Sequence, residues 1–291
     1  MANTLNLDGI KNYIAQNQEI IASQLVAMTP SVAFLQVQNG IKSDTSLHQL
    51  VTNLEIQSGT DCGFSAAGSQ TVSDRKFNPA LLKVNTEYCA KDFVGTYKAY
   101  ELKIAMGKSS LPLEEALIND ILQGIANENE RLIWSGDKSE GDLVDGFIKI
   151  MADANVKTIT TNVEGVYEKV KVAYKEIKDR KASIVMSTPM YKQLILDLME
   201  KNLYHYNETE NAEQVITLPG TNLKIYGIDG MEDAENMYVV RLDEMFVGMD
   251  NDADASTFDF FFSDDDRVYK LIVEWMLGVQ ILNPAHFMKV V

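Results

Sequence analysis

Few residues in the chain have the types and spacing of an active site. Gly107-Lys108-Ser109-Ser110 resembles the end of a phosphate-binding loop, in which backbone N–H groups and a lysine hold the phosphates. That motif needs a glycine five residues before Gly107, and Leu102 occupies the position. We therefore interpret the tetrapeptide as a polar turn that precedes a long helix.

A second candidate is an acidic run with the alternate spacing of a calcium-binding loop. Its aspartates are Asp250, Asp252 and Asp254, and carboxylate oxygens at this spacing can surround a divalent ion. The sixth position should be glycine and is Ala255, and the twelfth should be glutamate and is Phe261. We interpret the run as a solvated loop and predict no metal site, with a weak divalent-ion site as the alternative.

Histidines and cysteines lie in separate segments of the chain. None has metal-ligand spacing, and nothing local pairs a thiol with an imidazole as a nucleophile and its base would be paired. The sequence therefore predicts no catalytic residue, no metal and no cofactor. Two cysteines exclude a disulfide scaffold and favour folding in a reducing cytoplasm with both thiols buried. The residues concerned are His48, His205, His286, Cys62 and Cys89.

The overall composition is that of a globular protein. The chain has 291 residues, of which 46% are hydrophobic and 23% are charged. Its net charge is -16, which repels phosphate backbones and argues against a protein that grips nucleic acid. A wall that encloses DNA without binding it stays compatible with this charge. The most apolar stretch, 271–282, is too short to cross a bilayer, so we expect no membrane association.

The N-terminal third of the chain predicts a helix and a projecting hairpin. Residues 8–26 have an imperfect apolar stripe that predicts a short amphipathic helix ending at Pro30, outside the main core. Residues 59–74 are rich in small and polar side chains, and we expect a long hairpin flanked by strands at 54–56 and 81–84. A hairpin with so little core of its own is normally stabilised by another chain.

A long helix is the best-supported element of the sequence. Pro112 suits its first turn, the apolar residues then follow the helical period to Trp134, and Gly136 is a good stop. At 1.5 Å per residue the helix is roughly 33 Å long, and we expect its apolar face to pack on the C-terminal strands. The predicted core residues of this face are Leu117, Ile121, Ile125 and Ile133.

The rest of the chain predicts an α/β region followed by strands. A helix at 163–180, a buried strand at 182–187 and a helix that Thr188 caps and Pro189 starts come first. Strands follow at 223–228, 237–242, 245–249, 257–263 and 267–282, the last two forming a hairpin around a polar turn. The predicted fold class is therefore α+β.

Several segments, taken in order, resemble a known family. They are Asn85-Thr86-Glu87-Tyr88-Cys89-Ala90-Lys91-Asp92-Phe93, Leu111-Pro112-Leu113-Glu114-Glu115, Glu130-Arg131-Leu132-Ile133-Trp134-Ser135-Gly136-Asp137, Asp145-Gly146-Phe147, Ile184-Val185-Met186-Ser187-Thr188-Pro189 and Asn283-Pro284-Ala285-His286-Phe287. Their order resembles the major capsid proteins of tailed bacteriophages (Caudoviricetes), which have the Hong Kong 97 fold. It is similar in particular to the capsid proteins of phages that infect Bacteroidetes, including the crAss-like group.

The resemblance implies a division of the chain. Residues 1–44 would be an N-terminal arm and 45–80 an extended E-loop over a neighbouring subunit. Residues 81–150, which hold the long spine helix, and 255–291 would form a peripheral domain, and 151–254 an axial domain. The E-loop residues expected at the contact with the neighbour are Asp61, Phe64, Asp74, Arg75 and Lys76.

The resemblance also implies a function without catalysis. The expected assembly is an icosahedral phage head of pentamers and hexamers that forms in the host bacterial cytoplasm. This head would enclose double-stranded DNA without binding it specifically. Scaffolding, portal and decoration proteins are the implied partners. We predict no long helical scaffolding segment ahead of the arm and expect scaffolding from a separate protein or from a segment already removed, and no motif matches the lysine–asparagine crosslink of one branch. The alternatives are an encapsulin-type shell around cargo proteins and, as a different class, a soluble cytoplasmic enzyme with an unrecognised site.

Overall fold

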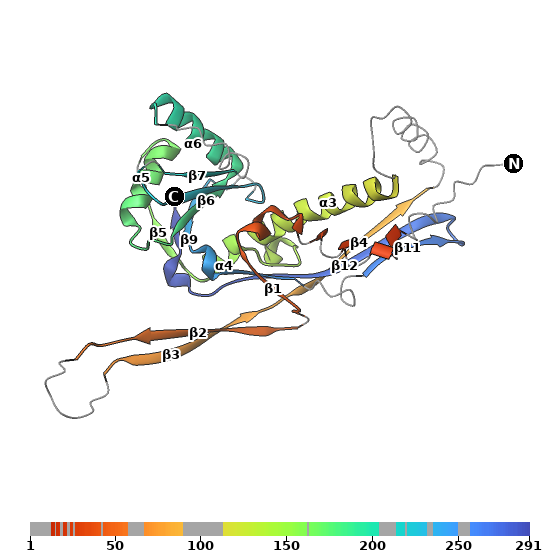
Figure 1. The fold of residues 1–291 in the computed structure, drawn as a ribbon, viewed down its shortest axis with the longest axis horizontal. Helices are drawn as coiled ribbons and strands as arrows, with labels where there is room; N and C mark the ends of the chain where they lie inside the picture. Colours follow the sequence, from red (N-terminus) through yellow and green to blue (C-terminus); the bar gives the residue numbers. More distant parts are fainter. Residues whose placement is uncertain are drawn as a thin grey trace.

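A computed structural model describes residues 13–291 with several gaps, and its chain forms two sheets and one separate hairpin (Figure 1). The gaps are residues 15, 18–19, 22–23, 26, 42, 58–66, 90–112, 162, 204–213, 219, 232–234 and 250–256. Among the described residues, no helix has the length and apolar character needed to span a membrane.

The first sheet has five strands and carries the larger core. Its order is β1-β10-β12-β11, and β4 pairs with β12 as well. The long β12 alternates between buried and partly buried side chains, so one face of this sheet lies in the core. The predicted C-terminal hairpin is confirmed, because β11 and β12 pair from Ser263 opposite Val268 onward. The strands are β1 (Gln36–Asn39), β4 (Ala80–Tyr88), β10 (Met245–Met249), β11 (Thr257–Ser263) and β12 (Val268–Ile281).

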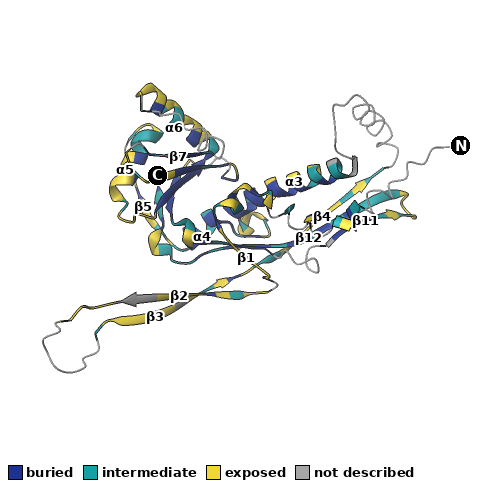
Figure 2. Ribbon diagram, in the orientation of Figure 1, coloured by how far each residue is buried: buried dark blue, intermediate teal, exposed yellow. Residues whose placement is uncertain are grey.

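The long helix α3 (Leu113–Ser135) covers the buried face of this sheet (Figure 2). Trp275 on β12 donates a hydrogen bond from Nε1 to Oδ1 of Asn129 on α3 over 3.0 Å, inside the core. The helix ends where its backbone meets another segment. A side chain at Gly136 would lie 2.5 Å from the carbonyl oxygen of Val144, so glycine is required there for space.

The second sheet has six strands, one face of which has its own core while the other joins the core around α3. Its order is β5-β13-β9-β6-β8-β7, and the helices α5 (Val166–Glu176) and α6 (Thr188–Glu200) pack against it (Figure 1). Every residue of the central strand β6 is buried, as the sequence predicted for a strand of this composition. The strands are β5 (Lys157–Ile159), β6 (Ser183–Ser187), β7 (Val215–Thr217), β8 (Lys224–Ile228), β9 (Met237–Val240) and β13 (Met288–Val290).

Several details of the prediction differ from the structure. Ser187, not Thr188, is the N-cap residue of α6, and the Thr188 hydroxyl bonds Oδ1 of Asp229 at 2.5 Å instead. The short helix α4 (Phe147–Asp153) was not predicted, because its apolar residues follow a polar loop without a clear period. Cys89 is only partly buried.

Sheet pairing differs from the division that the resemblance implied. Strand β10 lies before residue 255 but pairs with β12 in the five-stranded sheet. Strand β13 lies in the last segment but pairs with β5 and β9 in the six-stranded sheet. The chain therefore passes from the second sheet to the first through η3 (Leu242–Glu244) and returns through η4 (Pro284–His286).

The described N-terminal residues belong to the core, contrary to expectation. Ile14, Ile21 and Leu25 are buried in the cluster around α3 and β12. The segment then enters the short helix η1 (Pro30–Ala33), which begins at the proline and was not predicted. Ser31 in η1 donates hydrogen bonds from its backbone N–H and its hydroxyl to the buried carboxylate of Glu130 on α3. This N-terminal segment is therefore fixed to the body of its own chain.

The projecting hairpin consists of β2 (Thr45–Asn53) and β3 (Ser69–Phe77), which pair only with each other (Figure 1). The predicted strand at 81–84 is confirmed as part of β4, but it pairs with β12, and the second strand of the hairpin lies earlier in the chain. The predicted strand at 54–56 is wrong: Leu54 and Ile56 lie beyond β2 and are 79% and 97% exposed. Their apolar side chains suggested a strand buried in its own chain, and they are instead on the surface.

Candidate functional site

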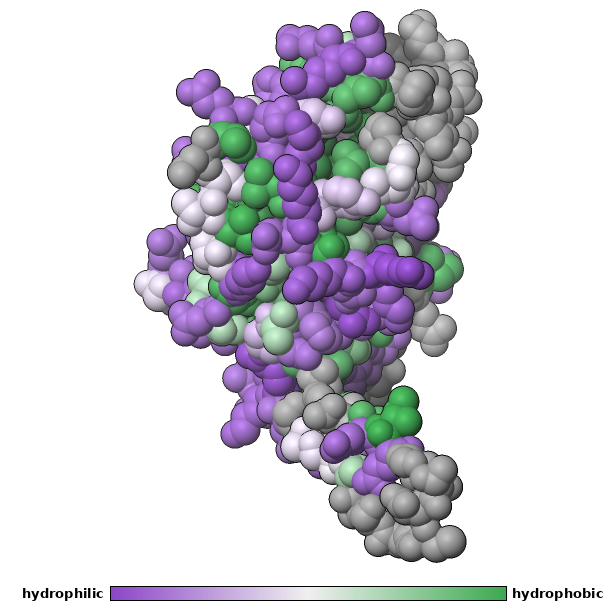
Figure 3. Space-filling model, turned by 90° about the vertical axis from the view of Figure 1, so that its left-hand side faces the viewer, coloured by the Kyte–Doolittle hydropathy of each residue, from purple (hydrophilic) through white to green (hydrophobic). Residues whose placement is uncertain are grey.

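One cross-strand pair of the hairpin exposes apolar side chains. Leu50 and Val72 are opposite each other in the β2–β3 register and are 61% and 65% exposed. Leu54 and Ile56, which follow β2 in the chain, are exposed as well. Figure 3 shows hydrophobic side chains on the described part of this projection. We call Leu50, Leu54, Ile56 and Val72 the hairpin patch. Apolar surface of this kind is typical of a site that another protein covers.

Charged groups lie near the same part of the hairpin. His48 and Asp74 form a cross-strand pair, with 2.6 Å between Nδ1 and Oδ1, and both side chains are exposed. Arg75 is partly buried, and this burial lowers the pKa of its guanidinium. The carbonyl of Lys76 accepts a hydrogen bond from Nε2 of Gln280 at 2.5 Å, which attaches the base of the hairpin to β12.

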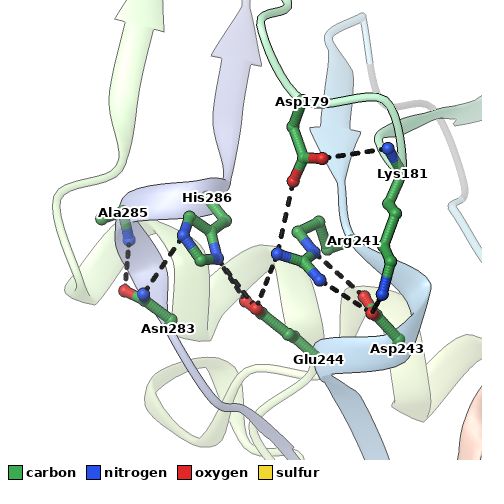
Figure 4. Close-up of polar contacts among 8 residues, drawn as sticks. All are labelled: Asp179, Lys181, Arg241, Asp243, Glu244, Asn283, Ala285 and His286. Carbon is green, nitrogen blue, oxygen red and sulfur yellow. Dashed lines mark hydrogen bonds and ion pairs between the residues drawn. The ribbon is translucent and has the colours of Figure 1, made fainter. Parts of the chain in front are cut away.

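A cluster of charged residues lies where the chain passes between the two sheets (Figure 4). Arg241, between β9 and η3, is at its centre. Its guanidinium lies 2.8 Å from Asp243, 3.2 Å from Glu244 and 3.3 Å from Asp179. Hydrogen bonding to Asp243 raises the pKa of Arg241, and the same bond lowers the pKa of Asp243. The ion pairs therefore keep the loop at the end of β9 in one arrangement.

The second connection between the sheets joins the same cluster. Nδ1 of His286 in η4 lies 2.8 Å from the carboxylate of Glu244 in η3, and the Glu244 side chain is only 9% exposed (Figure 4). Asn283 caps η4 by accepting a hydrogen bond from the Ala285 N–H. We call Arg241, Glu244 and His286 the junction cluster. Arg241 also pairs with Asp179 and Asp243, and His286 also contacts Asn283, so the polar groups of the cluster are used to hold the fold together.

A cavity of about 560 Å³ lies between η1, α3 and β8. The acidic groups Glu130 and Asp229 are among the residues that line it. Burial raises the pKa of Glu130, but both of its carboxylate oxygens are already used by Ser31. Asp229 is likewise bonded to Thr188 and Gln214. Both carboxylates therefore hold elements of the fold together. Among the described residues, no group of three or more His, Cys, Asp and Glu side chains could hold a metal ion.

The structure distributes the predicted site residues between the hairpin and the core. Asp74, Arg75 and Lys76 lie together on β3, whereas Asp61 and Phe64 fall outside the described residues. On α3, Ile125 and Ile133 are buried, and Leu117 and Ile121 are partly buried against the same core. The candidate motifs at 107–110 and 250–254, with Cys62 and His205, also fall outside the described residues.

Sequence reasoning missed the hairpin patch and the junction cluster. No repeating pattern marked the patch, because Leu50 is followed by the apolar Val51 and not by a polar residue. Leu50 and Val72 also share their face of the hairpin with His48 and Asp74, so neither strand has a continuous apolar face. Nothing local predicts the contact between Glu244 and His286, which are separated by 42 positions.

Comparisons with known proteins identify the fold. No protein-family model and no curated protein matches the chain. Solved structures do match. The capsid of a native GTA particle is 14% identical, with 90% of this chain and 89% of that chain covered and a TM-score of 0.60. The satellite phage P4 procapsid is 10% identical, with 94% and 90% covered and a TM-score of 0.61. The holo-SrpI encapsulin complex from Synechococcus elongatus is 9% identical, with 90% and 87% covered and a TM-score of 0.56.

These similarities extend over nearly the whole chain. The chain therefore has the Hong Kong 97-like fold, and the predicted α+β class, with its long helix and projecting hairpin, is confirmed. At sequence identities of 9–14%, these similarities show the fold alone. The function has to be argued from the surface of the chain.

Proposed function

We propose that this chain is a shell-forming structural protein, the major capsid protein of a tailed bacteriophage. The observation that carries the proposal is the hairpin patch: a protein with a capsid fold exposes apolar side chains on a projection that has almost no core of its own. The head would be built from pentamers and hexamers of this chain and would enclose double-stranded DNA.

The hairpin gives the proposal its physical basis. An isolated two-stranded hairpin is marginal in water, and ordering its backbone costs about 1–2 kcal/mol per residue. Leu50 and Val72 recover little of this cost while they face solvent. A second copy of the chain would bury them. In a closed ring the projection of one copy meets a different surface of the next, which is the heterologous contact that generates rings.

The two sheets fit the proposed division of a capsid subunit. The five-stranded sheet with α3 would be the peripheral domain, and the six-stranded sheet with α5 and α6 the axial domain. We assign β10 to the peripheral and β13 to the axial domain on their pairing. The N-terminal arm, and contacts of Asp61, Phe64, Asp74, Arg75 and Lys76 with a neighbour, remain part of the proposal.

The charge of the chain suits a container better than a DNA-binding protein. A net charge of -16 would let packaged DNA slide along the inner surface without adhering to it. Assembly in the host cytoplasm, scaffolding, portal and decoration partners, and a source among Bacteroidetes-infecting or crAss-like phages stay predictions from the sequence resemblance.

An encapsulin-type shell is the second candidate, favoured by the likeness to the SrpI encapsulin. The two functions differ in what the shell contains. Particles purified from cells that express the chain with its neighbouring genes should be treated with nuclease and then opened. Protected DNA of uniform length supports the phage head, and a stoichiometric cargo protein supports the encapsulin. Catalytic turnover by the free subunit would instead support the third hypothesis, that the chain is a soluble enzyme.

A further inference from the structure

Two glycines face each other in the five-stranded sheet. Gly248 on β10 is directly opposite Gly278 on β12, and their neighbours in both strands are large and buried. Neither glycine has a positive φ, so the backbone conformation does not require glycine here. The absence of two facing side chains leaves a recess in the sheet, which we call the glycine notch.

The ring of Phe77 fills the glycine notch. Phe77 is fully buried, and a Cβ atom at Gly278 would lie 2.8 Å from its Cε1 atom. A Cβ atom at Gly248 would overlap Cε1 and Cζ of the same ring and lie 2.6 Å from Cδ1 of Ile41. Since carbon atoms pack at about 3.5–4.0 Å, any side chain at either position must displace the ring.

Phe77 is also the last residue of β3, at the point where the hairpin leaves the body. Strand β4 begins three residues later at Ala80, after Pro79, whose Cα atom would lie 2.9 Å from a Cβ atom at Gly278. Ile41 and Leu47, from the other side of the hairpin base, pack with Phe77 in a small separate core. The Phe77 ring therefore connects the base of the hairpin to the five-stranded sheet.

We propose that Phe77, seated in the glycine notch, fixes the direction in which the β2–β3 hairpin projects. The ring is held by β10 and β12, and the two strands of the hairpin, β2 and β3, are each nine residues long. A small displacement at the ring therefore becomes a large displacement of the hairpin patch. The consequence for assembly rests on the proposed shell function: this contact inside one subunit determines where its hairpin meets the next copy.

The test uses a size exchange between the ring and the notch. Gly248→Ala is expected to displace the ring and redirect the hairpin, and Phe77→Leu to leave the notch partly empty and loosen it. The double variant Gly248→Ala/Phe77→Leu should recover the original direction, because the smaller side chain makes room for the methyl group. Gly124→Ala is the matched control, since a Cβ atom at Gly124 meets nothing within 4 Å.

The readout is a distance measured in the free subunit. Spin labels at Gln70→Cys and Asp265→Cys, in a background with Cys62→Ala and Cys89→Ala, report the hairpin against the body by pulsed electron paramagnetic resonance. A second pair, at Lys171→Cys and Asp265→Cys, reports the body alone. We expect Gly248→Ala to shift the first distance by several ångströms, the double variant to restore it, and the second distance to stay constant.

Other outcomes would overturn the inference. The first distance could stay unchanged in Gly248→Ala and Phe77→Leu, or both distances could shift together, which would make the notch a support of the sheet alone. If Gly248→Ala fails to fold, Phe77→Leu alone tests the inference. We then expect a broader distribution of the distance between the labels at positions 70 and 265. Particle formation is then scored by electron microscopy. A redirected hairpin with normal particles would contradict the proposed role of the hairpin in the shell and leave the anchoring by Phe77 intact.

Discussion

Nδ1 of His286 lies within 2.8 Å of both carboxylate oxygens of Glu244, and the two residues belong to different connections between the sheets. The backbone repeats this link, because the N–H of Leu282 donates to the carbonyl of Glu244 at 2.9 Å. With Arg241 on its other side, Glu244 joins the path out of the six-stranded sheet to the path back. Glu244 therefore adds a nearly buried polar link between two sheets that also share the hydrophobic core around α3.

Glu244→Gln should weaken this junction. The substitution keeps the size of the side chain but removes the charge that Arg241 and His286 face, so we expect a loss of about 1–3 kcal/mol in the free energy of unfolding. Denaturant titration of the free subunit measures it. Glu176→Gln, which removes the exposed pair with Lys157, is the control and should leave the denaturation midpoint nearly unchanged. Equal stability of Glu244→Gln and the parent would contradict the role of the junction cluster.

Asp142 should make stability depend on acid pH. Hydrogen bonds from Arg131 and from the Asp137 backbone N–H hold the pKa of Asp142 below its usual value of 3.8. A carboxyl whose pKa is lowered on folding stabilises the fold above its unfolded pKa, and this contribution is lost as pH falls through the folded pKa. Asp142→Asn should therefore cost about 1 kcal/mol at pH 7, and the difference from the parent should vanish in strong acid. A difference that stays constant between pH 7 and the acid limit would refute this.

Ile125→Asp should prevent stable folding. Ile125 is 5% exposed on the face of α3 that packs on β12, so the substitution buries an unpaired charge at a cost of more than about 4 kcal/mol. Gln123→Asp, on the exposed side of the same helix, is the matched control and should cost less than about 1 kcal/mol. Circular dichroism melting of both variants measures the contrast. Similar melting of the two would show that the buried face of α3 is assigned wrongly.

The C-terminal strands were predictable from sequence, because their apolar side chains are buried by the chain itself. Strand β10 matches its predicted bounds, and β11 and β12 match within a residue, since alternation along each strand records which face is in the core. The long helix was equally clear, with its terminal glycine in place. Its most buried face includes Ile118, which the predicted core residues omitted.

The hairpin and the pairing of β10 and β13 were harder to predict from the sequence, for a physical reason. Leu54 and Ile56 are apolar but exposed, so a pattern that assumes burial within one chain places a strand where there is none. The sheet that accepts β13 is decided by contacts with β5, which begins at Lys157, far away in the sequence. The glycine notch combines three distant positions, and no local pattern links Phe77 to Gly248 and Gly278.

The hairpin patch should matter for association and not for folding. Leu50→Asn with Val72→Asn removes apolar side chains that face solvent in the free subunit, so the free energy of unfolding should change by less than about 0.5 kcal/mol. Association into particles, followed by analytical ultracentrifugation, should fall strongly. Leu47→Asn is the contrasting control, because Leu47 is buried at the hairpin base and its loss should destabilise the subunit. Unimpaired association of the double variant would remove the patch from the proposed interface.

Electron cryomicroscopy of the purified chain, alone and with neighbouring virion proteins, tests the shell function most directly. We expect closed, uniform particles in which the hairpin of each subunit lies on an adjacent copy and buries Leu50 and Val72. A chain that stays monomeric under all of these conditions, with the hairpin exposed to solvent, would contradict it.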